Sequence, residues 1–279
     1  MDFKKFSNLI MIEQTLFALP FAYLGVLFAN GKNISTWILV TIALVAARTA
    51  GMSFNRVIDA KIDAKNPRTK DRLIPKGEVK QAHVWIIGTV SSLALIGSSY
   101  LLNSLCFYLS FAAIFLLFTY SFFKRFSSSS HFYLGFVESA APIGGYLAVT
   151  GEFSVVPFVL GGAILLWIAG LDIVYALLDV EFDKKEGLYS FPSAYGKKKA
   201  LTASGICYVL SFVAMITAGI ITGKSMPYWA ALACVAFIFI YQQKIARSRD
   251  IIQPLRIFFR INMYVSPFLL IGTLIDVFL

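Results

Sequence analysis

Long apolar runs separated by short polar breaks restrict the fold of this chain more than any other sequence feature. A helix that crosses the roughly 30 Å hydrocarbon core of a bilayer needs about 20 mostly apolar residues. Runs of this kind lie near residues 10–30, 37–57, 83–102, 105–123, 132–150, 157–179, 201–222, 227–243 and 258–278. Turn formers such as Asn30-Gly31, Pro75 and Gly223 occupy the breaks. The sequence therefore predicts an all-α polytopic membrane protein, a single domain over 1–279 built as a bundle of nine transmembrane helices.

The composition supports this fold class and excludes others. Of the 279 residues, 58% are hydrophobic and 14% are charged, whereas soluble proteins average about 45–50% and about 25%. The three cysteines lie singly in apolar runs without a C-x-x-C pair, so they predict no disulfide framework. His83 and His131 stand at helix starts without a second histidine at ligand spacing, which predicts interfacial positions rather than a metal site.

Basic residues are distributed unevenly over the predicted loops. With nine spans the loops fall into two sets, and all of the 25 Lys and Arg residues except Lys32 and Lys224 lie on the side of the amino terminus. Cytoplasmic loops carry such an excess. We therefore expect a cytoplasmic amino terminus in a multi-pass protein of the inner (cytoplasmic) membrane. The net charge of +10 then reflects topology and contact with the lipid bilayer, with no nucleic acid as partner.

Two acidic segments, residues 55–63 and 175–183, repeat one spacing at the ends of the second and sixth predicted helices. Each carries polar groups at i, i+4 and i+8, which lie on one helix face. These groups are Asn55, Asp59, Asp63, Tyr175, Asp179 and Asp183. Carboxylates near the bilayer centre cost about 2.5–3.5 kcal/mol each. A hard divalent cation between the two segments would make them tolerable, because Mg²⁺ prefers carboxylate and phosphate oxygens. For either segment alone, a solvated helix end is the alternative.

Basic and phenolic groups accompany the acidic segments. Arg48 lies two turns before the first segment, and Tyr120 and Lys124 stand one turn apart in the fourth predicted helix. The loop after the first segment offers Arg68 and Arg72 as clamps for phosphate. For Arg48 the alternative is an ion pair with a nearby carboxylate, and for Lys124 it is a side chain that reaches the membrane interface beside a tyrosine. For the loop arginines the alternative is a role in topology alone.

Two long motifs resemble a known family. N-R-V-I-D-A-K-I-D-A-K-N-P-R-T-K-D-R-L-I-P-K-G over residues 55–77 is similar to the first signature of the UbiA superfamily of intramembrane prenyltransferases. D-I-V-Y-A-L-L-D-V-E-F-D-K-K-E-G over residues 172–187 is similar to its second. The resemblance implies a helical bundle with a cavity open sideways to lipid and a magnesium-dependent active site that faces the cytoplasm.

The resemblance also implies a role for each candidate residue. On one side of bound Mg²⁺ and diphosphate it places Asn55, Asp59 and Asp63. On the other side it places Asp179 and Asp183, with Tyr175 as a further substrate-binding residue. The positions that match the surroundings of the diphosphate are Arg48, Tyr120, Lys124, Arg68 and Arg72. For Arg48 we expect contact with diphosphate rather than with the acceptor.

The reaction that the resemblance implies is prenyl transfer to an aromatic ring. Metal and cationic side chains would stabilise the diphosphate that leaves a polyprenyl diphosphate, and an electron-rich aromatic acceptor would attack the allylic carbocation. Asp172 would position the acceptor or accept the proton that it loses. A carboxylate that only packs helices together is the alternative for Asp172.

The acceptor is the least determined part of this interpretation. Residues 13–22 and 179–192 are similar to a bacterial subgroup of 4-hydroxybenzoate polyprenyltransferases of quinone biosynthesis, which includes members of the futalosine route to menaquinone. Hydroxybenzoate enzymes often carry an arginine in the first helix, where this chain has the acidic and neutral stretch 13–20. Ubiquinone-type and menaquinone-type acceptors both stay open. A cation-coupled membrane transporter is the alternative from another class.

Overall fold

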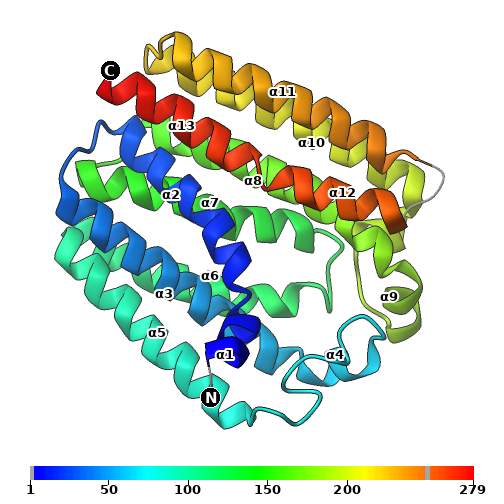
Figure 1. Ribbon diagram of the computed structural model, residues 1–279. Coiled ribbons are helices and arrows are strands. Elements are labelled where there is room, and N and C mark those ends of the chain that lie inside the picture. Colours follow the sequence, from blue (N-terminus) through cyan, green and yellow to red (C-terminus); the bar gives the residue numbers. More distant parts are fainter. Residues whose placement is uncertain (1–2, 249–251) are drawn as a thin grey trace.

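The computed structural model describes residues 3–248 and 252–279, with side chains for 4–248 and 257–279, and within these ranges it contains only helices and their connections (Figure 1). The helices are α1 (Phe3–Ile10), α2 (Ile12–Phe28), α3 (Ile34–Ile58), α4 (Ala60–Lys65), α5 (Gln81–Leu102), α6 (Ser104–Phe123), α7 (Ser130–Thr150), α8 (Val155–Tyr175), the 3₁₀ turn η1 (Ala176–Leu178), α9 (Val180–Glu186), α10 (Phe191–Ile221), α11 (Met226–Ala246), α12 (Ile252–Asn262) and α13 (Val265–Phe278).

The apolar runs correspond to the membrane-crossing helices. Among the described residues, eight helical stretches are long and apolar enough to span a bilayer, and α1 with α2 makes a ninth if this bent pair is one span. The two helices meet at an angle of 56°, at Met11, whose φ of 50° lies in the left-handed region. The all-helical fold with about nine spans is thus confirmed. The side of the membrane on which the amino terminus lies remains a prediction.

One helix starts well before the apolar run that predicted it. The run begins near residue 201, but α10 begins at Phe191, where Ser190 caps it by accepting a hydrogen bond from the Ser193 amide at 3.3 Å. Gly196, with a φ of 81°, kinks α10 after this capped first part, and the longer helical part that follows begins with the three lysines 197–199. A search for apolar runs omits such a cationic turn, although the backbone around it is helical.

Small residues set the distance between α2 and α7. A Cβ on Gly25 would collide with the Pro142 carbonyl, and a Cβ on Gly145 would collide with the Ala22 carbonyl. Helices in lipid associate mainly through such close contacts, since apolar side chains gain little by leaving lipid. The buried rings of Phe21 and Trp167 pack edge to face at 5.3 Å and extend this contact to α8.

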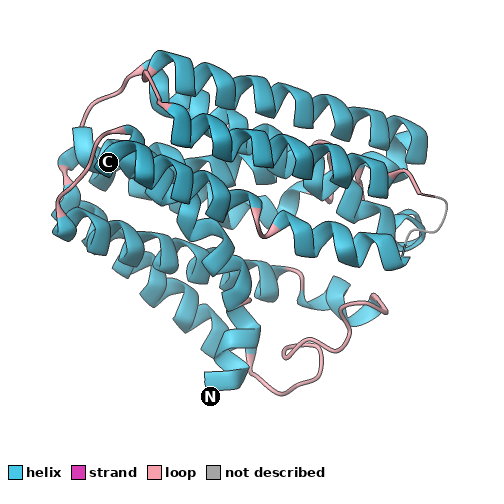
Figure 2. Cartoon of the chain, turned by 45° about the horizontal axis from the view of Figure 1, so that its top comes forward, coloured by secondary structure: helices cyan, strands magenta, loops and turns pink. Residues whose placement is uncertain are grey.

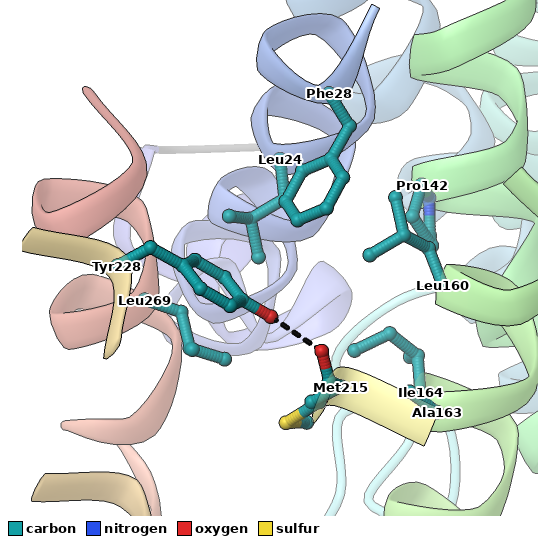
Figure 3. A pocket seen from close by; sticks show the side chains of 9 residues that line it. All are labelled: Leu24, Phe28, Pro142, Leu160, Ala163, Ile164, Met215, Tyr228 and Leu269. Carbon is teal, nitrogen blue, oxygen red and sulfur yellow. Dashed lines mark hydrogen bonds between the residues drawn. The ribbon is translucent and has the colours of Figure 1, made fainter. Parts of the chain in front are cut away.

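The two short helices α4 and α9 lie near each other at one end of the bundle, in the views of Figures 1 and 2. Lys65 of α4 and Glu186 of α9 form an ion pair of 2.6 Å there. A separate cavity of about 20 Å³ has an apolar lining that includes Leu24, Phe28 and Leu160 (Figure 3). Beside it the Tyr228 hydroxyl donates a hydrogen bond of 2.7 Å to the Met215 carbonyl. Such a void holds roughly one water molecule. The polar groups predicted to bind substrate gather instead at the α4 and α9 end.

Candidate active site

The first acidic segment crosses a break between two helices without losing its helical spacing. Asp59 separates α3 from α4, yet its amide donates to the Asn55 carbonyl at 2.9 Å and its own carbonyl accepts from the Asp63 amide at 2.8 Å. The Asn55 side-chain amide also donates to Asp59 Oδ2 at 2.9 Å. The predicted alignment of these side chains is therefore present. Asp59 and Asp63 are 1% and 4% exposed, so the alternative of a solvated helix end does not hold for this segment.

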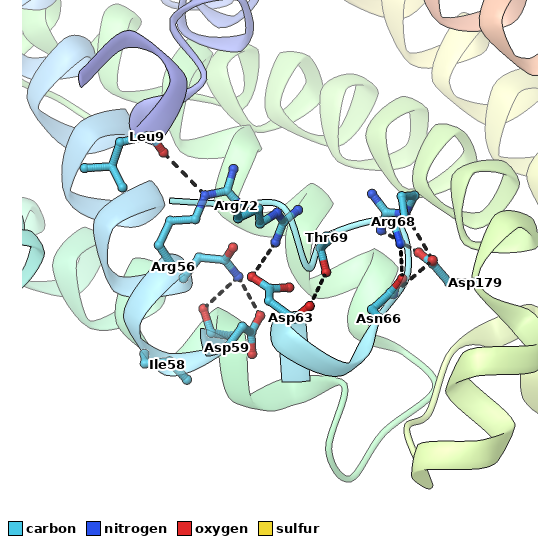
Figure 4. Close-up of polar contacts among 12 residues, drawn as sticks. Leu9, Arg56, Ile58, Asp59, Asp63, Asn66, Arg68, Thr69, Arg72 and Asp179 are labelled. Atoms are coloured by element: carbon cyan, nitrogen blue, oxygen red, sulfur yellow. Dashed lines mark hydrogen bonds and ion pairs between the residues drawn. The ribbon is translucent and has the colours of Figure 1, made fainter. Parts of the chain in front are cut away.

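Cations neutralise both buried carboxylates. Lys124 Nζ lies 2.7 Å from Asp59 Oδ2, and Arg125 lies 3.3 Å from Asp59 Oδ1. Arg72 Nη1 lies 2.6 Å from Asp63 Oδ2 (Figure 4). These carboxylates are therefore tolerated without a divalent cation, contrary to the prediction, because basic side chains already compensate their charge. Arg125 was not among the predicted site residues, although its position beside Lys124 was a usable signal.

The second acidic segment has a break at the equivalent position. Asp179 lies between η1 and α9, and its carbonyl accepts from the Asp183 amide at 2.8 Å. Arg68 forms a bidentate ion pair with Asp179, in which Nε donates to Oδ1 at 3.0 Å and Nη2 donates to Oδ2 at 2.6 Å. Its third nitrogen donates to the Tyr175 hydroxyl at 2.7 Å. Burial alone would lower the pKa of Arg68, but the bond to Asp179 and the charges of Tyr175 and Asp179 raise it.

The loop after α4, residues 66–72, connects the two acidic segments through its side chains (Figure 4). The Asn66 side chain accepts from the Arg68 amide at 2.8 Å and donates to Asp179 at 3.3 Å. The Thr69 hydroxyl anchors the loop by donating to the Asp63 carbonyl at 3.1 Å. The fold thus brings together segments more than a hundred residues apart. Asn66 and Thr69 were not predicted as site residues, because their role depends on contacts with Asp179 and Asp63 that the loop sequence alone does not reveal.

Asp183 completes the acidic set. It is partly buried, and burial raises the pKa of its carboxyl while a hydrogen bond with Ser190 lowers it, with a net rise. Ser190 is the N-cap of α10, so the helix cap and the last acidic residue share one contact.

The donor chemistry fits Mg²⁺, although no ligand cage is preformed. In the described ranges, no three His, Cys, Asp or Glu side chains are grouped so as to hold a metal ion. Mg²⁺ usually binds one or two carboxylates and completes its shell with substrate phosphates and water. Two pairs of aspartates on either side of a loop with two arginines suit a magnesium diphosphate. The residues that would hold the metal are Asn55, Asp59, Asp63, Asp179 and Asp183.

A second polar layer lies deeper in the bundle. Arg48 stands seven residues before Asn55, about 10 Å further along α3. It pairs with Glu138 of α7 and lies 3.3 Å from the Gln14 side-chain oxygen, while its buried Nε has no partner among the described residues. Glu138 was not predicted, although an acidic residue within the apolar run 132–150 was a usable signal. Pairing with a carboxylate, the alternative for Arg48, is what the structure shows.

Tyr120 connects this deeper layer with the acidic segments. It lies on α6, one turn before Lys124, and α6 packs against α3 and α7, which carry Arg48 and Glu138. Asp172 itself accepts a hydrogen bond from His131, with 2.7 Å between Nδ1 and Oδ2. His131 stands at a helix start as predicted, in the first turn of α7, but it is buried there, at 3% exposed, between Asp172 of α8 and Phe191 of α10. Its place at the membrane interface stays a prediction.

Comparison with known proteins identifies the fold and the family. A family profile described as the UbiA prenyltransferase family matches residues 18–264. The chain belongs to this family. The 4-hydroxybenzoate octaprenyltransferase of Xanthomonas campestris pv. campestris is 31% identical over 77% of this chain and 71% of its own length. That of Vibrio parahaemolyticus is 29% identical over 96% of this chain and 92% of its own length.

Solved UbiA structures agree with this assignment. The apo structure of a UbiA homologue from Aeropyrum pernix superposes with a TM-score of 0.88 at 31% identity and covers 95% of this chain and 98% of that one. A UbiA homologue from Archaeoglobus fulgidus, bound to GPP and Mg²⁺, has the same fold, with a TM-score of 0.73 at 16% identity over 95% of this chain and 97% of that one. This UbiA protein is therefore a membrane-embedded prenyltransferase, and the transporter alternative is set aside.

Proposed function

We propose that this UbiA protein transfers a polyprenyl group from a polyprenyl diphosphate to an aromatic acceptor of quinone biosynthesis, with 4-hydroxybenzoate as the first candidate. One observation carries the site assignment: the loop 66–72 joins both acidic segments, through Arg72 to Asp63 and through Arg68 to Asp179. A diphosphate that enters between the segments meets carboxylates for its metal and cations for its own charge.

The basic side chains change partners in this mechanism. Lys124, Arg68 and Arg72 neutralise aspartates now, and each is within a side chain's reach of a diphosphate held beside those aspartates. Bound Mg²⁺ would supply Lewis-acid stabilisation of the charge on the departing diphosphate. As the allylic C–O bond breaks, the bonding pair goes to the diphosphate, whose growing charge these cations stabilise. Tyr175, whose ring packs on Arg68 at 5.0 Å, lies beside this path.

The acceptor belongs in the deeper layer around Tyr120. Arg48 is suited to a carboxylate on the acceptor, as in 4-hydroxybenzoate, but Glu138 already neutralises it. The missing arginine near residues 13–20, together with the similarity of residues 13–22 and 179–192 to a subgroup that includes futalosine-route members, favours a second candidate, an aromatic acceptor of the futalosine route to menaquinone.

The test is an assay in membranes with labelled prenyl diphosphates of several chain lengths. A panel of aromatic acceptors would be offered with Mg²⁺ and, separately, with EDTA. We expect one acceptor to be prenylated and EDTA to abolish the product. The preferred acceptor distinguishes the two candidates, and no product with any acceptor in the presence of Mg²⁺ would contradict the proposed function.

We also propose that the site faces the cytoplasm from the inner membrane. Reporter fusions after Gly77, Ser129 and Glu186 are expected to report the cytoplasm, because the predicted loops there carry the basic excess. Fusions after Gly31 and Gly223 should report the other side. A further predicted cytoplasmic loop, 244–257, contains residues 249–251, which lie outside the described residues. A non-cytoplasmic signal at Gly77 would contradict this orientation.

A further inference from the structure

His131 is a buried histidine whose two ring nitrogens both have defined partners. Nδ1 lies 2.7 Å from Asp172 Oδ2 on α8, and Nε2 lies 3.0 Å from the backbone amide of Phe191, the first residue of α10. The ring itself sits in the first turn of α7. A single side chain therefore connects three elements at the active-site end of the bundle.

These contacts determine the tautomer of the imidazole. The Phe191 amide can only donate, so Nε2 must accept and carries no proton. In the neutral ring the remaining proton then sits on Nδ1 and is donated to Asp172. Asp172 Oδ2 is engaged by this bond, and no hydrogen bond between described residues engages Oδ1. The geometry thus orients the carboxylate and leaves one oxygen for a substrate.

Asp172 stands where an aromatic acceptor is expected. It is seven residues before Asp179, about 10 Å deeper along the segment. Its charge acts on Tyr120, together with those of Asp59, Glu138 and Arg48. Asp172 therefore lies deeper than the proposed metal ligand Asp179, where the proposed mechanism needs the acceptor ring to meet the allylic carbon.

We propose that His131 is a positioning residue that holds Asp172 as the acceptor of the proton released by the aromatic substrate. This inference rests on the proposed prenyl transfer. The ring carbon attacks the allylic cation with its π electrons, so a C–C bond forms, while the bonding pair of the broken C–O bond has left with diphosphate. The ring C–H bond then breaks, its electrons restore aromaticity, and the proton passes to Asp172 Oδ1. His131 stays neutral throughout and only donates to Oδ2.

Two substitutions separate this role from a structural one. An asparagine amide can take the place of Nδ1, and a glutamine amide can take the place of Nε2. H131N therefore keeps a donor for Asp172 and loses the contact with Phe191, whereas H131Q keeps the Phe191 contact and loses the donor. We expect H131Q to lower kcat roughly 10- to 100-fold, the usual effect of losing a hydrogen bond to a charged group, and H131N to restore most of that loss.

A kinetic isotope effect provides the second readout. The probe is 4-hydroxybenzoate, or the acceptor that the panel identifies, with deuterium at the ring positions that are prenylated. Slower proton removal in H131Q should increase the isotope effect on kcat relative to wild type, with the KM for prenyl diphosphate nearly unchanged. D172N, which can still accept from His131, should show the same increase if H131Q does not fold. H83Q, at the other histidine, is the matched control and should behave as wild type.

The outcomes are distinguishable. A larger isotope effect in H131Q or D172N, with recovery in H131N, supports the proposal. Equal loss in H131N and H131Q, or an unchanged isotope effect in folded D172N, would overturn it and leave the prenyl transfer intact. A wild-type protein that prenylates no acceptor would instead overturn the proposed function, and this inference with it.

Discussion

The two acidic segments have the same spacing and the same helix break, but their surroundings differ. In the first, Asp59 is 1% exposed and lies between two cations of the α6 end, Lys124 and Arg125. In the second, the Asp179 side chain is 15% exposed, and its only ion pair within the described residues is with Arg68, which belongs to the loop after the first segment. A repeated motif thus sits in one closed and one more open environment.

This difference suits the two segments to different parts of the proposed reaction. The first segment is held by several partners, which are Asn55, Lys124 and Arg125 for Asp59 and Arg72 for Asp63. The second is held chiefly through the fork of Arg68, a side chain that is also suited to diphosphate. In the proposed mechanism, a diphosphate that binds Arg68 would free Asp179 for a metal, whereas Asp59 would still have Arg125 beside it.

The largest loss of turnover should come from removing a single aspartate charge in either segment. D59N and D179N are each expected to reduce turnover at least 100-fold, about 2.7 kcal/mol of transition-state stabilisation, because each removes a proposed metal ligand. Steady-state turnover of the purified variants measures this. Near-normal turnover in D179N with loss in D59N would show that only the first segment serves the reaction.

The same two variants should differ in stability. D59N leaves Lys124 and Arg125 without their buried counter-charge and should lower the free energy of unfolding by about 1–3 kcal/mol, more than D179N does. Thermal unfolding in detergent measures the difference. Equal stabilities would mean that the two environments are energetically alike.

Replacing Arg68 tests the connection between the segments. R68K keeps the charge but loses the fork, so the KM for prenyl diphosphate should rise roughly 10- to 100-fold with little change in the acceptor KM. R125K, a change of the same kind at the single 3.3 Å contact of Arg125 with Asp59, is the matched comparison and should have a smaller effect. If the KM for prenyl diphosphate rises more in R125K than in R68K, the cation that binds diphosphate belongs to the first segment and not to the second.

Replacing Arg48 should have the smallest effect on the KM for prenyl diphosphate if this residue belongs to the deeper layer. The sequence favoured a diphosphate clamp, whereas Arg48 lies about 10 Å deeper than Asn55 along α3, in the layer proposed for the acceptor. R48K should then raise the acceptor KM roughly tenfold and leave the prenyl diphosphate KM nearly unchanged. The reverse pattern would return Arg48 to the diphosphate and strengthen the original interpretation.

Local sequence was sufficient for the helices and for the acidic residues. A span needs only enough consecutive apolar residues, and Asp59 follows Asn55 by one turn whatever the rest of the chain does. Most of the candidate site residues could be named for the same reason, since they lie within the two motifs 55–77 and 172–187.

The pairing of those residues was decided by the tertiary structure alone. Arg68 meets Asp179 across 111 residues, Arg48 meets Glu138 across 90, and His131 meets Asp172 across 41. No periodicity relates such positions, because their contact depends on which helices pack together and at what depth. Helix packing therefore determined which carboxylates are neutralised, which histidine is buried and which oxygen remains free for a substrate.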